Sequence, residues 1–181
     1  MKKILAASVV LALFATLAPA LDVAGVKMPD TVTVEGKTLN LNGAGVRKKM
    51  LFKVYVAGLY VERASKDGSA ILAAPGVKSM RLHMLRDVKG KQISDSIMDG
   101  FQKNSQEQIA RLKDRLDKLT AMFPDVAEGD EIGLTWVPDK GTVVTVRGTE
   151  RGTIEGRDFA DALFAVWIGP NPVQDDLKKA L

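Results

Sequence analysis

The sequence predicts an α+β fold in which a mostly antiparallel sheet is backed by a layer of helices. Strand-like segments come first along the chain, two helical segments lie together in the middle, and a hairpin and further helices follow. Of the 181 residues, 46% are hydrophobic and 27% are charged, which is typical of a globular chain. No repeat, low-complexity tract or linker divides the chain, so we expect a single domain.

Residues 1–20 are typical of a secretory signal peptide. Lys2 and Lys3 precede an apolar stretch, and Ala18-Pro19-Ala20 supplies small residues for cleavage. The apolar stretch is shorter than the about 20 residues that a membrane-spanning helix requires, which favours cleavage after Ala20 over an uncleaved anchor. We therefore expect residues 21–181 to form one domain that is periplasmic or secreted and has no stable membrane span.

The first half of this domain is rich in predicted strands. Alternation and turn chemistry predict a hairpin of residues 31–34 and 38–42, which ends at Gly43-Ala44-Gly45. A long strand is predicted over residues 50–62, and because both of its faces are largely apolar, we expect it to be covered on both sides. A short helix within residues 65–74 and a strand over residues 78–85 follow.

The second half begins with two predicted helices. One spans residues 91–103, and the other begins at Ser105, where Gln108 three residues later suggests a capping box, and continues to Phe123 before Pro124. The remaining elements are a hairpin of residues 131–137 and 142–147, a short strand near Thr153, and helices over 157–167 and from the Gly169–Pro172 break to Leu181.

Composition excludes several kinds of functional site. The chain has no cysteine and a single histidine, His83, so a thiolate nucleophile, a disulfide and a multi-histidine metal centre are unavailable. We expect no cofactor and no metal. Without Lys2 and Lys3 the 26 basic residues become 24 against 22 acidic ones, and the net charge falls from +4 to +2. This near balance argues against a nucleic-acid partner.

The most informative segment is residues 42–62, NGAGVRKKMLFKVYVAGLYVE. Arg47 is predicted in the turn after the glycines, and Tyr55 lies eight residues later on one face of the following strand. A guanidinium beside a phenol suits the binding of a carboxylate or an enolate-type oxygen. A surface arginine and a core tyrosine also explain these two residues.

The run GAGVR followed by KVYVAGLYVE resembles the chalcone isomerase family. The last 23 residues, FADALFAVWIGPNPVQDDLKKAL, are similar to the end of bacterial chalcone isomerase-like proteins. The resemblance extends over residues 21–181 and implies an open-faced β-sandwich of the chalcone isomerase type, in which helices cover a large sheet.

The enzymes of this family close a chalcone to a flavanone by intramolecular addition. The resemblance implies that their arginine corresponds to Arg47, whereas Tyr55 stands in place of a strand threonine. The other catalytic positions hold a tyrosine, an asparagine and a Ser or Thr in the enzymes. Their approximate counterparts in this chain are Ile93, Gly100 and Val166. The loss of these polar groups removes stabilisation that no neighbour replaces.

A second class in the family is non-catalytic and binds fatty acids. The resemblance implies that Arg47 and Tyr55 hold the carboxylate, while the acyl chain lies in an apolar cleft between sheet and helices. The candidate lining comes from the Tyr55 face of the strand and from the helix residues Ile97, Phe101, Leu112 and Leu116, whose apolar pattern is equally that of a core. We therefore expect a periplasmic protein that binds a fatty acid or a similar apolar carboxylate.

Two alternatives remain open from the sequence. One is an intramolecular lyase for an unknown α,β-unsaturated substrate, with Arg47 as the electrophilic group and Tyr55 as proton donor. The other is an envelope scaffold whose cleft is filled by its own side chains. The sequence leaves the oligomeric state open.

Overall fold

The computed structural model describes residues 20–181, so the predicted signal peptide, apart from Ala20, lies outside the described residues. Seven strands form one sheet in the order in which they follow along the chain, each antiparallel to its neighbours. They are β3 (Thr31–Val34), β4 (Lys37–Lys49), β5 (Phe52–Val61), β6 (Lys78–Met84), β7 (Glu131–Val137), β8 (Gly141–Val146) and β9 (Thr149–Ile154). The predicted antiparallel sheet is confirmed.

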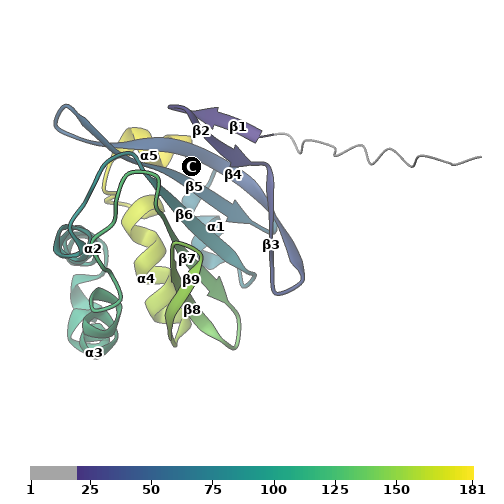
Figure 1. Cartoon of the computed structure of the whole chain (residues 1–181). Helices are drawn as coiled ribbons and strands as arrows, with labels where there is room; N and C mark the ends of the chain where they lie inside the picture. The colour runs from purple at the N-terminus through teal and green to yellow at the C-terminus, as the bar shows by residue number, and fades with distance from the viewer. Residues whose placement is uncertain (1–19) are drawn as a thin grey trace, which may run out of the picture.

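Helices cover one face of this sheet. They are α1 (Gly68–Ala73), α2 (Gly90–Ser105), the 3-10 turn η1 (Gln106–Gln108), α3 (Ile109–Thr120), α4 (Arg157–Ile168) and α5 (Asp175–Ala180). In Figure 1 the sheet curls around α4, and α2 and α3 lie on the other side of that helix. Nine of the twelve residues of α4 are buried, because the sheet and α2 pack against it from different sides.

The opposite face of the sheet is partly covered by a separate hairpin, β1 (Ala20–Val23) and β2 (Val26–Pro29), which the sequence analysis did not predict. The side chain of Met28 packs there with Val56 and Tyr60 of β5 and with Leu39 of β4. The other face of β5 contributes Ala57, Leu59 and Val61 to the larger core beneath the helices. The expectation that β5 is covered on both sides is therefore confirmed.

Strand β4 is longer than predicted. The predicted end of this strand at Gly43-Ala44-Gly45 and the predicted turn at Arg47 are both wrong. All three residues pair with β5, the strand continues to Lys49, and the two-residue turn lies at Met50 and Leu51. Glycine is an unfavourable strand residue in isolation, but here the long neighbouring strand keeps the backbone extended and paired.

The junction between α2 and α3 also differs from the prediction. Ser105 is the last residue of α2 and is buried, and its side chain makes no capping hydrogen bond. The 3-10 turn η1 then leads directly into α3, whose N-cap is Gln108 and makes no side-chain capping hydrogen bond, so the predicted capping box is absent at this junction. Helix α3 ends at Thr120, and Phe123 is buried beyond that end.

Candidate functional site

A cavity of about 250 Å³ opens between the sheet and the helices. Strands β5 and β6 form one wall, and helices α2 and α4 form the other. Its apolar lining consists of Met50, Phe52, Val54, Leu82, Met84, Val88, Ile93, Ile97, Ile132, Val166, Trp167 and Val173. Its polar lining consists of Arg47, Lys49, Tyr55, Arg86, Asp87, Gln92 and Ser96. An apolar cavity with a few polar groups is the usual form of a small-molecule site.

The structure brings together the two residues that the sequence analysis singled out. Arg47 and Tyr55 are directly paired across β4 and β5, and both line the cavity. A β-bulge follows Arg47, where the register shifts before the pairing of Lys48 with Lys53. Residues that pair across two strands point to the same face of the sheet, so the guanidinium and the phenol both lie on the helix-covered side.

Gln174, just before α5, positions Arg47. Its Oε1 accepts a hydrogen bond from Arg47 Nη1 at 3.3 Å and another from the backbone N–H of Lys48 at 2.8 Å, while its Nε2 donates to the carbonyl of Val46. Arg47 Nη1 also donates to the carbonyl of Lys48. A guanidinium has five N–H donors, so these contacts leave donors for a ligand.

The glycines of the Gly43-Ala44-Gly45 run explain why α5 and Gln174 lie so close to β4. A Cβ atom on Gly43 would lie 2.2 Å from the carbonyl oxygen of Ala180, and one on Gly45 would lie 2.7 Å from the Cβ of the same alanine. Only glycine permits this approach of the C-terminal helix. The motif therefore serves the site indirectly, because it allows the C-terminal segment to reach Arg47.

Tyr55 is held from the other side by α4. The indole Nε1 of Trp167 donates a hydrogen bond of 3.0 Å to the hydroxyl oxygen of Tyr55. Burial raises the pKa of Tyr55 above its usual value, although the Trp167 hydrogen bond and the charge of Arg47 act in the opposite direction. The phenol is therefore protonated at neutral pH, and its O–H is available to donate to a bound oxygen.

The helix residues predicted to line the cleft divide into two groups. Ile97 lines the cavity as predicted. Phe101, Leu112 and Leu116 do not, because their side chains are enclosed in the core between the helices and the sheet. For these three the structure shows the core position that the sequence left open, because an apolar stripe on a helix does not distinguish a cavity wall from a filled core.

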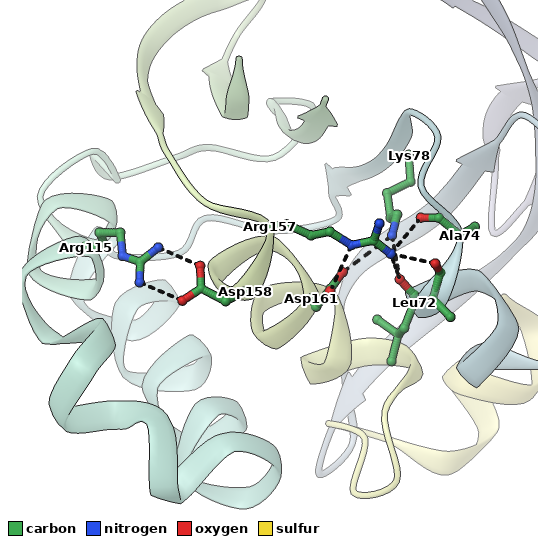
Figure 2. A network of polar contacts seen from close by, with 8 residues as sticks. Leu72, Ala74, Lys78, Arg115, Arg157, Asp158 and Asp161 are labelled. Carbon is green, nitrogen blue, oxygen red and sulfur yellow. Dashed lines mark hydrogen bonds and ion pairs between the residues drawn. The ribbon is translucent and has the colours of Figure 1, made fainter. Parts of the chain in front are cut away.

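Polar contacts fix the beginning of α4, the helix that carries Val166 and Trp167 to the cavity. Arg115 of α3 donates two hydrogen bonds, of 2.8 and 2.9 Å, to the carboxylate of Asp158 (Figure 2). Such a bidentate pair is more specific in geometry than a single ion pair. Arg157 also donates to carbonyl oxygens at the end of α1, those of Leu72, Ala73 and Ala74.

Lys78, the first residue of β6, is the buried member of this network (Figure 2). Only 2% of its surface is exposed, and its Nζ donates to the carbonyl of Leu72 at 2.9 Å and lies 3.6 Å from Asp161 of α4. Burial lowers the pKa of Lys78, whereas the charge of Asp161 acts against that change. The contacts of Lys78 are to backbone and to α4, so its role is to fasten the helix rather than to bind a ligand.

The remaining candidates lie away from the cavity. His83 pairs with Val56 and Glu131 across neighbouring strands and does not line the cavity. In residues 20–181 no group of three or more histidine, aspartate or glutamate side chains is placed to hold a metal ion. No helix in this part of the chain is long and apolar enough to cross a membrane.

Two residues of the site, Trp167 and Gln174, were not predicted. Both belong to the C-terminal stretch on which the family resemblance rests. Neither the identity of these residues nor their spacing in the sequence indicates a role at the site. Their contacts join positions 112 and 127 residues apart, which only the folded chain reveals.

Comparison with known proteins gives a family and a fold. A family model described as chalcone isomerase-like matches residues 20–181. Among solved structures, a fatty-acid binding protein of Arabidopsis thaliana shares the fold with a TM-score of 0.67, over 86% of this chain and 91% of that chain, at 18% sequence identity. No curated protein gives a significant match.

Proposed function

The chain belongs to the chalcone isomerase-like family, and from this premise we propose that it binds a fatty acid or a similar apolar carboxylate without catalysing a reaction on it. Arg47 and Tyr55 hold the carboxylate, and the acyl chain occupies the cavity between the sheet and the helices. The observation that carries this proposal is the direct pairing of these two side chains at an otherwise largely apolar cavity.

The two ends of such a ligand have different requirements. A carboxylate removed from water needs a cation or hydrogen-bond donors, and the site offers the free N–H groups of Arg47 and the O–H of Tyr55. Burial of the acyl chain is favourable by ~0.8 kcal/mol for each methylene group. A single polar clamp and an apolar cavity are therefore sufficient for binding.

The positions that correspond to catalytic groups of chalcone isomerases support a binding role. Ile93 and Val166, which the resemblance makes the approximate counterparts of the enzymes' tyrosine and Ser or Thr, both line the cavity. Gly100 lies against Val166, and a Cβ atom at that position would come within 2.6 Å of the valine side chain. Apolar groups at these positions favour an acyl chain over a polar substrate that has to be activated.

The shared fold gives further support. The Arabidopsis protein of similar structure is named as a fatty-acid binding protein. The cavity of this chain is also open to a ligand, which favours binding over a scaffold whose own side chains fill the cleft.

The decisive test compares a saturated fatty acid with the alcohol of the same chain length. Both ligands bury the same acyl chain, but only the acid presents a carboxylate to Arg47. We expect Arg47→Ala to weaken binding of the acid by about tenfold to a hundredfold, the effect of losing a hydrogen bond to a charged group. Binding of the alcohol should change little. Competition with a fluorescent fatty acid measures both affinities.

Arg63 provides a matched control, because it is an exposed arginine beyond the other end of β5. Arg63→Ala should bind both ligands as the wild type does. Unchanged affinity for the acid in Arg47→Ala would refute the proposed clamp. Turnover of a panel of chalcones well above the uncatalysed rate, lost in Arg47→Ala, would instead establish an intramolecular lyase.

We also propose that the protein acts outside the cytoplasm, after cleavage behind Ala20. The proposal is supported by the two lysines, the apolar stretch and the small residues at its end within positions 1–20. The N-terminal sequence of the protein recovered from a periplasmic fraction tests it, and an intact N-terminus in the cytoplasm would contradict it.

A further inference from the structure

The turn between β4 and β5 carries an unusual concentration of exposed apolar side chains. Met50 is 90% exposed, Leu51 97% and Phe52 59%. Among the large hydrophobic residues of the described chain, the only other exposed one is Leu21, at 45%. The turn projects beyond the body of the sheet in Figure 1. We call residues 48–53 the hairpin tip.

The fold itself does not require these apolar residues. Met50 has a φ of 55°, a backbone conformation that favours glycine or asparagine in a two-residue hairpin turn. A methionine there is strained, and neither Met50 nor Leu51 gains compensation by burial. Folding alone would favour a polar turn with glycine, so the apolar pair indicates contact with something outside this chain.

The same tip is positively charged. Lys48 and Lys53 are directly paired across the two strands, and like charges in that arrangement destabilise a hairpin. Lys49 follows, and the guanidinium of Arg86 lies 4.8 Å from the ring centroid of Phe52. None of these four cations forms an ion pair with any residue in the described part of the chain.

Asp87 is the acidic residue at this end of the cavity, and one of its carboxylate oxygens accepts a hydrogen bond from the backbone N–H of Glu128. Residues 48–53 hold three lysines and no acidic residue, so the hairpin tip itself carries a positive excess. Apolar side chains surrounded by lysine and arginine are complementary to an anionic lipid surface, where the chains enter the interface and the cations meet the headgroups.

The tip also borders the entrance of the cavity. Lys49, Met50, Phe52 and Arg86 belong to the cavity lining as well as to this surface. A ligand that enters from the tip therefore passes along an apolar edge before it reaches Arg47. The proposed binding function and the surface chemistry of the tip thus concern the same end of the molecule.

We propose that the hairpin tip docks on anionic lipid membranes, with Met50 and Leu51 inserted among the lipids and Lys48, Lys49, Lys53 and Arg86 at the headgroups. Docking brings the cavity entrance to the bilayer, so that the apolar ligand moves between membrane and protein with little exposure to water. Such exchange presupposes the fatty-acid binding proposed above, whereas the docking is tested without it.

Flotation with lipid vesicles measures docking directly. The full chain is expressed and its soluble form purified, and every variant has the same N-terminus, so differences between variants report the tip. We expect the wild type to float with phosphatidylcholine vesicles that contain phosphatidylglycerol, and to float less as salt is raised. Lys53→Gln should weaken partitioning by about fivefold, the effect of one cation near an anionic surface. Leu51→Ser should weaken it by roughly tenfold.

Two matched controls lie elsewhere on the chain. Lys66→Gln changes an exposed lysine beyond the opposite end of β5, and Leu21→Ser changes the other exposed large hydrophobic residue. Neither should alter flotation. Absence of wild-type binding to anionic vesicles would overturn the proposal. Binding by Leu51→Ser and Lys53→Gln as strong as that of the wild type would overturn it as well.

Failure of docking is distinguishable from failure of ligand binding. Lys53 and Leu51 do not line the cavity, so their variants should retain the wild-type affinity for fatty acid in buffer without vesicles. Arg47→Ala should lose fatty-acid affinity but still float with vesicles. A Leu51→Ser variant that lost fatty-acid affinity in buffer would show that the tip acts on the cavity instead of on the membrane.

Discussion

At the scale of single residues, the two tyrosines of β5 differ in the surroundings of their hydroxyl groups. Tyr55 faces the cavity and its hydroxyl is held by Trp167. Tyr60 faces the other side of the sheet, where it is fully buried and its hydroxyl has no hydrogen-bond partner among the described residues. The ordered phenol of Tyr55 suits ligand binding, whereas the hydroxyl of Tyr60 only adds a desolvation penalty.

Tyr60→Phe should therefore leave the free energy of unfolding at neutral pH unchanged or raise it by about 1 kcal/mol, because it removes an unsatisfied polar group without changing the packing. Tyr55→Phe, the matched change on the opposite face, should give no such gain, since it breaks the bond to Trp167. Urea denaturation followed by circular dichroism measures both. A clear loss of stability in Tyr60→Phe would show that its hydroxyl has a partner.

The same variant gives a dependence on pH. Burial raises the pKa of Tyr60 from 10.0 to about 12, with the nearby Arg81 acting in the opposite direction. Between these values the unfolded chain loses this proton while the folded chain keeps it, so stability falls as pH rises from 10.0 towards about 12. Wild type should lose stability more steeply than Tyr60→Phe in this range. If the free energy of unfolding fell equally with pH in the wild type and in Tyr60→Phe, the raised pKa of Tyr60 would be contradicted.

At the scale of elements, the contact between β4 and α5 determines where Arg47 lies. Helix α5 has only six residues, yet it packs closely on β4 because Gly43 and Gly45 leave room for it. Asn42 adds a hydrogen bond from its side-chain amide to the carbonyl of the C-terminal Leu181. The position of Gln174, and through it that of Arg47, depends on this packing.

Gly43→Ala tests this arrangement. The new methyl group would lie 2.2 Å from the backbone oxygen of Ala180, so α5 has to move. We expect a loss of about 1–3 kcal/mol in the free energy of unfolding, typical of overpacking. We also expect weaker fatty-acid binding, because Gln174 moves away from Arg47. Thr38→Ala, at an exposed position of the same strand, should change neither. Wild-type stability in Gly43→Ala would show that α5 is not held as described.

The elements that could be predicted are those whose pattern depends on local chemistry. A long, largely apolar run predicts β5 correctly, and alternation of apolar residues predicts β6 and the hairpin of β7 and β8. The end of β4 was predicted wrongly because a glycine run is typical of a turn, and only the neighbouring β5 and α5 explain why it is extended. The false helix start at Ser105 has a similar cause, since the burial of this residue depends on tertiary packing.

At the scale of the whole molecule, the curled sheet separates two regions with different roles. The side opposite the helices is partly covered by β1 and β2 over a small core. The helix side contains the larger core and the cavity, and the hairpin tip lies at the cavity entrance. The net charge of +4 says little about this arrangement, because the charges to which we assign a role by proposal are local: Arg47 at the cavity and the cations of the tip.

The candidate site could be predicted only in part. Arg47 and Tyr55 follow from residue chemistry together with the family resemblance, and the structure places them side by side. Trp167 and Gln174 could not be predicted, because their roles depend on contacts between distant parts of the chain. For Phe101 the sequence allowed both a core position and a cavity position, and only the packing decides between them. The tip was overlooked because exposure of Met50 and Leu51 becomes apparent only once the turn is located.

The proposed binding mode can be examined in a crystal structure of the protein with a saturated fatty acid. We expect the carboxylate to lie about 2.7–3.2 Å from the guanidinium of Arg47 and the hydroxyl of Tyr55, a normal hydrogen-bond distance. The acyl chain should run past Val54, Ile93 and Val166 inside the cavity. A carboxylate bound away from Arg47, or a cavity without fatty acid at saturating concentration, would refute fatty-acid binding through Arg47 and Tyr55.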